Sequence, residues 1–270
     1  MHMMYNSSIE RENKIPNIFQ EENKMKKIIA LILVAMFALT GMAMAEKLTM
    51  ATNVAFPPYE FYGDDGETPV GIDVEIAQAI CEKLGYELEV KDIAFDAVIG
   101  GVASGKYDFG MAGMTVTEER KQSVLFSDTY ATAQQVVIVK EGSALTLDSL
   151  SEGGYKIGVQ MGTTGDLYST WDYEDTGLCT VERYNTGADA VEALKKDKVD
   201  CVVIDNEPAK AFVNANEGLT ILETAYAIED YAACFALDNV ELQQAFNAAL
   251  AELTADGTVA AIIEKYIPAE

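Results

Sequence analysis

One arginine and one aspartate occupy positions from which they could hold opposite charges on one small molecule. Arg120 lies in AGMTVTEERKQ (112–122), shortly after the strand-like segment YDFGMAG (107–113), and Asp205 ends the strand-like segment VDCVVID (199–205). A guanidinium grips a carboxylate through two parallel hydrogen bonds, and an aspartate accepts hydrogen bonds from an ammonium group. On opposite sides of a cleft, these two side chains would define a pocket for an α-amino acid.

Each of the two residues also has a purely structural interpretation. Arg120 falls in the first turn of a predicted helix that Thr117 would cap, where it could form an exposed ion pair with Glu118 or Glu119. Asp205 precedes the predicted helix EPAKAFV and could cap it. On these residues alone, the binding and the structural interpretations both stay open.

Two loops near these residues suit an anion. GMT (113–115) and MGTTGD (161–166) each follow a strand-like segment and precede a helical one. Such turns present free backbone N–H groups and a helix dipole to a ligand, although each loop alone is also typical of an ordinary strand-to-helix turn. In open α/β sheets, ligands bind beyond the carboxyl ends of the strands. The candidates at those ends, with the loop residues, are Asn53, Phe56, Phe95, Ala112, Gly113, Thr115, Gln160 and Thr164.

Two series of alternating strands and helices are predicted to position these residues. In the first series, strands are expected at 47–53, 86–93 and 107–113, and helices at 72–85 and 95–105. In the second series, strands are expected at 133–140, 155–160, 180–185 and 199–205, with a helix at 187–196. A strand at 231–238 and helices at 239–253 and 257–267 follow. This alternation predicts an α/β fold with two lobes, and the absence of a Pro, Gly or Ser-rich linker predicts that strands connect them.

Apolar periodicity makes the helix at 72–85 one of the strongest of these predictions. Ile72, Ile76, Ile80 and Leu84 recur at helical spacing and would share one buried face, and Gly85 is a typical helix stop.

Composition excludes several other classes of protein. A chain of 270 residues that is 49% hydrophobic can bury one large or two modest cores. Its 44 acidic against 19 basic residues, a net charge of -25, argue against nucleic acid as a partner. The one histidine, His2, lies in a segment that we expect to be removed, which argues against Ser-His or Cys-His catalysis and most metal sites. No cofactor and no metal are expected.

The N-terminal region resembles an export signal. Met25 and two lysines precede the apolar run 28–40, and small residues stand at Ala43 and Ala45, so cleavage is predicted after Ala45. The polar residues 1–24 would then be an upstream extension, and the remaining chain would be periplasmic. An uncleaved membrane anchor is the alternative.

Four cysteines would enter the oxidising compartment with this chain: Cys81, Cys179, Cys201 and Cys234. Their spacing matches no metal or disulfide framework. Either a disulfide or four buried thiols are compatible with the sequence.

Five stretches together resemble the polar-amino-acid group of bacterial solute-binding proteins that serve ATP-driven (ABC) importers. They are ATNVAFPPYEF, VGIDVEIAQAI, YDFGMAGMTVTEERKQSVLFSDTY, YKIGVQMGTTGD and VDCVVIDNEPAKAFV, and the resemblance extends from about Lys47 to Ile267. It implies the periplasmic-binding-protein fold, with two α/β lobes, two hinge strands and the ligand cleft between the lobes.

The resemblance also implies boundaries and roles. Lobe 1 would comprise 46–133 and 236–270, lobe 2 would comprise 139–230, and the hinges would lie at about 134–138 and 231–235. The ligand carboxylate would be held by the residues at the positions of Arg120, Gly113, Thr115 and Thr164, and its amino group by the residue at the position of Asp205. Phe56 and Phe95 match positions where aromatic rings enclose the ligand, although both also suit core filling.

The implied function is capture of a free L-amino acid by a monomer and its delivery to a membrane ABC permease, without catalysis. Asn53 is a neutral amide where relatives that bind cationic side chains often carry an acid, which favours a polar uncharged ligand such as glutamine. The aromatic rings keep a basic ligand open through cation–π contact. The alternatives are an enzyme on the same scaffold, similar to a cyclic amino acid dehydratase, or a ligand-sensing module.

Overall fold

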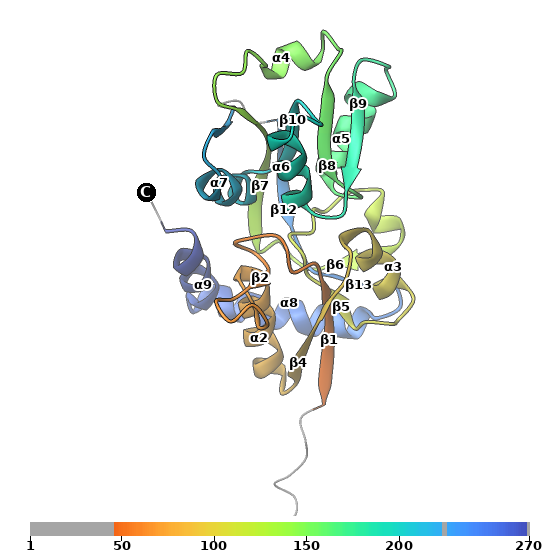
Figure 1. The fold of residues 1–270 in the computed structure, drawn as a ribbon. Helices are drawn as coiled ribbons and strands as arrows, with labels where there is room; N and C mark the ends of the chain where they lie inside the picture. The colour runs from red at the N-terminus through yellow and green to blue at the C-terminus, as the bar shows by residue number, and fades with distance from the viewer. Residues whose placement is uncertain (1–45, 223–225, 269–270) are drawn as a thin grey trace, which may run out of the picture. The chain divides into compact units, whose positions relative to one another are not determined.

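The computed structural model describes residues 46–222 and 226–268. The predicted signal peptide and its cleavage site therefore lie outside the described residues. Within them the chain forms two main β-sheets, each covered by its own helices (Figure 1).

The first sheet has the strand order β4-β1-β5-β13-β6. Its strands are β1 (Lys47–Thr52), β4 (Glu87–Asp92), β5 (Phe109–Gly110), β6 (Val124–Phe126) and β13 (Cys234–Ala236). β1 pairs in parallel with β4 and β5, whereas β13 runs antiparallel to β5 and β6. The helices of this lobe are α2 (Ile72–Leu84), α3 (Val98–Ala103), α8 (Val240–Ala255) and α9 (Thr258–Tyr266), and a small hairpin joins β2 (Phe61–Tyr62) to β3 (Pro69–Val70).

The second sheet has the order β11-β7-β10-β8-β9, with β12 also paired to β7. Its strands are β7 (Ala131–Lys140), β8 (Lys156–Gln160), β9 (Thr180–Tyr184), β10 (Cys201–Asp205), β11 (Leu219–Ile221) and β12 (Ala227–Tyr231). β8 lies parallel to β9 and β10, and β7 runs antiparallel to β10. The helices of this lobe are α4 (Leu147–Leu150), α5 (Thr164–Ser169), α6 (Gly187–Lys195) and α7 (Asn206–Ala215).

The chain passes between the two sheets twice. It leaves the first sheet after β6 and enters the second at β7, and it returns from β12 to β13. The predicted α/β fold with two lobes is therefore confirmed. The lobe boundaries stay a prediction. We place the two crossings at 127–130, between the end of β6 and the start of β7, and at 232–233, between the end of β12 and the start of β13.

Three sequence predictions of local structure were wrong in detail. The single strand expected at 231–238 is broken, because Tyr231 ends β12, Ala232 and Ala233 bond Met114 and Ser127, and only Cys234–Ala236 form β13. The strand expected at 107–113 is paired only at Phe109–Gly110. The helix expected after Thr117 is one 3-10 turn, Arg120–Gln122.

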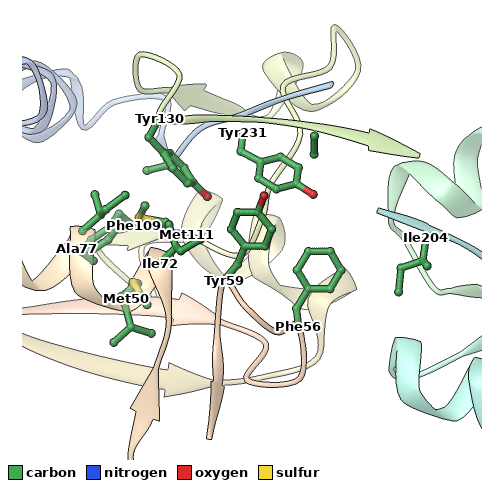
Figure 2. Close-up of a cluster of buried hydrophobic side chains, with 14 of the residues drawn as sticks. Met50, Phe56, Tyr59, Ile72, Ala77, Phe109, Met111, Tyr130, Ile204 and Tyr231 are labelled. Carbon is green, nitrogen blue, oxygen red and sulfur yellow. The ribbon is translucent and has the colours of Figure 1, made fainter. Parts of the chain in front are cut away.

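The helix at 72–85 forms as predicted. Ile72, Ile76 and Ile80 are buried on one face of α2, and Gly85 ends the helix with a left-handed φ of 83°. Its face packs on a core that contains Met50, Phe109 and Met111, and tyrosines cover the end of this core nearest the other lobe (Figure 2).

All four cysteines are free and buried. They therefore serve as small apolar core residues in this structure, and no disulfide forms among them. No single helix within the described ranges is long and apolar enough to cross a membrane, and α8 and α9, bent by 76°, pass that test only as a pair.

Candidate ligand-binding cleft

All ten side chains that the sequence singled out for binding line one cavity between the two lobes. It encloses about 290 Å³ of space that no protein atom fills, part of it open to solvent. From the first lobe it is lined by Asn53, Phe56, Phe95, Ala112, Gly113, Thr115 and Arg120, and from the second by Gln160, Thr164 and Asp205. Thr163 of the loop MGTTGD and Glu60, which the sequence did not single out, complete the lining. That these residues bind a ligand remains a prediction.

Arg120 is buried, with 7% of its surface exposed, and it faces the cavity. Its Nη1 donates to the backbone oxygen of Thr115 at 2.7 Å, and its Nη2 donates to that of Gly162 at 3.0 Å across the cleft. Its guanidinium also lies 5.5 Å from the ring centroid of Phe95. Because a guanidinium has five N–H groups, donors remain for a ligand carboxylate.

The exposed ion pair considered for Arg120 is wrong. Glu118 instead pairs with Lys121 at 2.7 Å on the surface. Thr117 does not cap a helix, since only a 3-10 turn follows it, but its Oγ1 accepts a hydrogen bond from the backbone N–H of Arg120 at 3.1 Å. Burial lowers the pKa of Arg120, and the negative charge of Glu229 opposes that shift more than any other group.

Asp205 stands at the N-terminus of α7, but its side chain makes no capping bond there. The capping interpretation is therefore wrong. The carboxylate accepts a hydrogen bond from the hydroxyl of Tyr231 instead, in a buried position. Burial, reinforced by the charge of Glu229, raises the pKa of Asp205 to about 8. A buried carboxyl of this kind gains an ionic partner when an ammonium group arrives.

The loop 113–115 differs from the expectation that its amides are free. The N–H of Gly113 donates to Oδ2 of Asp73 at 2.7 Å, so it is already paired. The hydroxyls of Thr115 and Thr164, one from each lobe, approach to 3.4 Å. Thr163 caps α5 by accepting from the N–H of Asp166.

Gly113 is required where it stands for two reasons. Its φ of +52° disfavours any side chain, and a Cβ there would lie 2.7 Å from Cε1 of Phe56. We expect Gly113→Ala to displace Phe56 and to weaken ligand binding about tenfold or more, measured by calorimetry. The matched control is Gly66→Ala, at φ +70° with no atom within 4 Å of the added Cβ. Equal affinity losses in both variants would contradict a role of the Phe56 contact.

Two amides join the lobes at another part of the cavity. The Nε2 group of Gln160 donates to Oδ1 of Asn53 at 2.9 Å, and Nδ2 of Asn53 donates to the backbone oxygen of Ile93 at 2.9 Å. The amide of Asn53 therefore already uses hydrogen-bonding capacity on protein partners, and less of it remains to distinguish one ligand side chain from another.

Sequence reasoning missed a pair of carboxyl groups beside the cavity. Glu60 and Asp73 are wholly buried, and neither side-chain oxygen of Glu60 has a hydrogen-bond partner among the described residues. Burial raises the pKa of Glu60 well above its usual range, and it raises that of Asp73 to about 6 against the opposing effect of hydrogen bonds from Gly113 and Tyr130. Asp73 holds the Gly113 loop by accepting the hydrogen bond of the Gly113 N–H. Neither residue follows a strand of the main sheets, so the strand-end rule could not find them.

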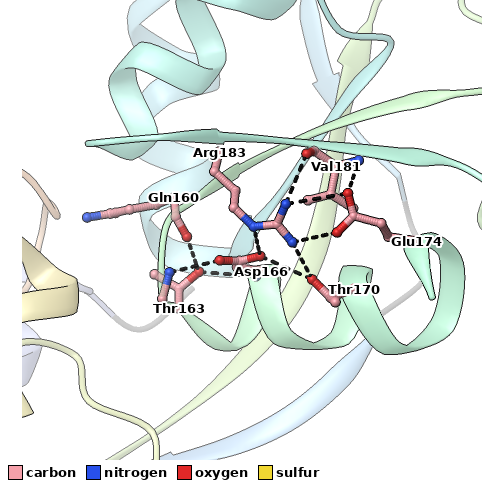
Figure 3. A network of polar contacts seen from close by, with 8 residues as sticks. Gln160, Thr163, Asp166, Thr170, Glu174, Val181 and Arg183 are labelled. Carbon is pink, nitrogen blue, oxygen red and sulfur yellow. Dashed lines mark hydrogen bonds and ion pairs between the residues drawn. The ribbon is translucent and has the colours of Figure 1, made fainter.

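A second polar network stiffens the loop MGTTGD. Arg183 of β9 pairs with Asp166 at 2.9 Å and with Glu174 at 2.7 Å (Figure 3). Asp166 in turn accepts from the N–H of Gly162 at 2.9 Å. The network thereby fixes the backbone oxygen of Gly162 that receives Arg120. Within the described residues no group of His, Cys, Asp and Glu is arranged to hold a metal.

Comparison with known proteins agrees with this geometry. The profile of the bacterial extracellular solute-binding proteins, family 3, matches residues 48–269. The arginine-binding extracellular protein ArtP of Bacillus subtilis is 32% identical over 259 residues, which span 91% of this chain and all of the relative. An ancestral arginine-binding protein solved with arginine is 39% identical with a TM-score of 0.77, covering 83% of this chain and 99% of its own.

A structure of an ancestral arginine-binding protein bound to glutamine is similar as well. It is 38% identical with a TM-score of 0.76, and the match covers 83% of this chain and 98% of that protein. These relatives are binding proteins rather than enzymes. By the extent of the profile match and these identities, the chain belongs to family 3 of the bacterial extracellular solute-binding proteins.

Proposed function

We propose that this protein captures a free L-amino acid between its two lobes and delivers it to a membrane ABC permease. The observation that carries the proposal is the pairing of Arg120 and Asp205 on one cavity, from different lobes. Arg120 would hold the α-carboxylate through its remaining N–H groups, and Asp205 would accept from the α-ammonium group. A ligand held at both ends bridges the lobes.

Binding would stabilise a closed form that the permease can distinguish from an open one. Contacts that already cross the cleft around the cavity include Arg120 to Gly162, Gln160 to Asn53, and Thr115 to Thr164. A bridging ligand adds to the same contacts and so shifts the equilibrium towards closure. Hinge closure around a ligand is the general behaviour of periplasmic binding proteins.

We further propose that the preferred ligand carries a basic side chain, with arginine the first to test. Among the described residues that line the cavity, Arg120 is the only cation, and the rings of Phe56 and Phe95 can stabilise a guanidinium. The relatives named above are arginine-binding proteins, one of them solved with glutamine bound. The argument from Asn53 for a glutamine preference is weaker than this argument for a basic ligand, because the Asn53 amide already bonds Ile93 and Gln160.

The experiment is a thermal-shift panel on residues 46–270, unfolded and refolded to remove bound ligand. A ligand at 100 times its Kd adds about 2.7 kcal/mol to stability, which raises the melting temperature visibly. We expect the largest rise with arginine, and the ligand recovered unchanged. A larger rise with glutamine would overturn the basic preference, and no rise with any amino acid would overturn the function. Conversion of the ligand would point to the enzyme alternative.

Asn53→Asp is expected to shift the preference further towards basic ligands. A carboxylate at position 53 attracts the guanidinium of arginine, whereas it neither attracts nor repels the neutral side chain of glutamine by charge. The ratio of arginine to glutamine affinity should therefore rise at least about tenfold, or ~1.4 kcal/mol. Calorimetry with both amino acids measures the ratio. Asn185→Asp adds the same charge at an exposed position and should leave the ratio unchanged. A ratio that does not change in Asn53→Asp would show that the ligand side chain does not reach Asn53.

A further inference from the structure

A second buried acid, Glu229 of β12, bonds groups from both lobes. Its Oε2 accepts hydrogen bonds from Nε2 of Gln135 at 2.9 Å and from Oγ1 of Thr115 at 3.2 Å. Its other oxygen, Oε1, is buried and has no hydrogen-bond partner among the described residues. Glu229 is not one of the residues that line the cavity, so its influence on a ligand passes through the groups that it bonds.

The register of the two strands next to the lobe crossings creates this contact. Glu229 of β12 lies opposite Ala133 of β7, and Gln135 follows Ala133 by two residues. Residues two apart on a strand point to the same face of the sheet, and a long side chain can reach a diagonal neighbour on the paired strand. Glu229 and Gln135 therefore meet on one face of the second sheet.

The first lobe supplies Thr115 to the same group. Thr115 forms a β-bridge with Tyr231, the last residue of β12, and two flanking backbone hydrogen bonds of 3.0 and 3.1 Å hold its loop along the end of this strand. Because Glu229 precedes Tyr231 by two residues, its side chain lies on the face to which Thr115 points. Backbone pairing thus brings the Thr115 hydroxyl to the acid.

The donors of this group set its hydrogen-bond directions. An amide nitrogen only donates, so Nε2 of Gln135 donates to Glu229 and, at 3.3 Å, to Oγ1 of Thr164. Thr115 gives its single hydroxyl proton to Glu229, which leaves its Oγ1 with lone pairs only. Thr164 keeps its own proton, which can point to Thr115, 3.4 Å away, or to a ligand. Thr115 can therefore accept from a ligand, and Thr164 can donate to one.

We propose that Glu229 and Gln135 form a positioning pair, which assigns opposite hydrogen-bonding roles to these two threonines of the cavity wall. Thr115 offers lone pairs to the ammonium group of the ligand, and Thr164 offers a proton to its carboxylate. The Thr115 hydroxyl then serves the ammonium end, although the family resemblance implies that Thr115 helps to hold the carboxylate. The inference rests on the proposed function, since it requires that an amino acid binds in this cavity.

Calorimetry of arginine binding to the protein stripped of ligand tests the pair. Glu229→Met removes the acceptor but keeps a side chain of similar length, so the hydroxyl proton of Thr115 becomes free to face the ammonium group. The affinity should fall about tenfold, or ~1.4 kcal/mol. The matched control is Glu182→Met, at an exposed position of β9, which should bind arginine as tightly as the wild type.

Glu229→Gln separates hydrogen-bond direction from charge. The donating Nε2 of Gln135 favours the new amide oxygen at the position of Oε2, and the new amide nitrogen then takes the position of Oε1, where it displaces no hydrogen bond. The acceptor for Thr115 is retained, so this variant should recover most of the affinity that Glu229→Met loses. A loss as large as that of Glu229→Met would overturn the proposal, because the charge rather than the acceptor would then matter.

A double-mutant cycle shows whether Glu229 acts through Thr115. In Thr115→Val, which has no hydroxyl to orient, Glu229→Met should lower the affinity by no more than about twofold. A purely structural role would lower it about tenfold in both backgrounds, and that result would overturn the proposal. If Glu229→Met does not fold, Gln135→Met breaks the pair from the other strand and should also weaken binding about tenfold, or ~1.4 kcal/mol, whereas wild-type affinity there would overturn the proposal.

The outcomes separate this inference from the proposed function. Wild-type affinity in Glu229→Met would overturn the positioning pair and leave amino acid capture intact. Neither binding heat nor a thermal shift of the wild type with arginine, glutamine or cystine would overturn the proposed function, and this inference with it.

Discussion

Replacing Arg120 by lysine is expected to weaken amino acid binding about 100-fold, or ~2.7 kcal/mol. The guanidinium spans the cleft, with one nitrogen on Thr115 and another on Gly162, while it retains N–H groups for a carboxylate. A lysine ammonium is a single point of charge and cannot reproduce this fork. The variant therefore loses both a grip on the ligand and a contact between the lobes. Calorimetry with the best ligand of the thermal-shift panel measures the effect.

Arg183→Lys is the matched control for this prediction. Arg183 forms two ion pairs within the second lobe, to Asp166 and Glu174, and does not line the cavity. The same substitution there should lower the stability of the second lobe and, because Asp166 also positions the loop of Gly162, weaken binding only indirectly and far less than Arg120→Lys does. Wild-type affinity in Arg120→Lys, or equal losses in the two variants, would contradict the carboxylate assignment.

The sequence predicted the side chains of the cavity better than the boundaries of the strands that carry them. Arg120 and Asp205 stood out because each follows a strand, and the strand-end rule depends only on the order of elements and not on their exact limits. The helix α2 was predictable for a similar reason, since Ile72, Ile76 and Ile80 define its buried face locally.

Long-range packing explains what the sequence could not predict. The partners of Glu229 are Thr115, 114 residues away, and Gln135, 94 residues away, so no local pattern marks this residue. Long-range contacts also explain why the structural interpretations of Arg120 and Asp205 were wrong, since Arg120 bonds the oxygen of Gly162 and Asp205 bonds the hydroxyl of Tyr231. The strand at 231–238 was predicted as one segment because its apolar residues are continuous, although they belong to two sheets.

Asp205→Asn is expected to abolish amino acid binding while it stabilises the ligand-free protein at alkaline pH. The asparagine keeps an acceptor for the Tyr231 hydroxyl but offers no charge to an ammonium group, so the affinity should fall at least about 100-fold. The stability effect follows from burial, which raises the pKa of Asp205 to about 8 in the folded protein, against about 4 in an unfolded chain.

The sign of the pH dependence follows from proton binding. Between these two pKa values the folded protein binds the Asp205 proton more tightly than the unfolded chain does, so the stability falls as the pH rises from about 4 to about 8. Asparagine removes this component. The slope that Glu60 and Asp73 contribute through their own raised pKa values remains in the variant.

Calorimetric melting of the stripped proteins at pH 5 and pH 8.5 tests the prediction. At pH 8.5 the variant should melt at least about 2 °C above the wild type, the shift that ~1 kcal/mol produces in a protein of this size, and this difference should shrink at pH 5. Asp238→Asn, at an exposed position, should melt like the wild type at both pH values. A variant that is less stable than the wild type at pH 8.5 would show that Asp205 stabilises the empty cavity. The expected result would instead mean that the chain retains a destabilising buried acid because the ligand requires it.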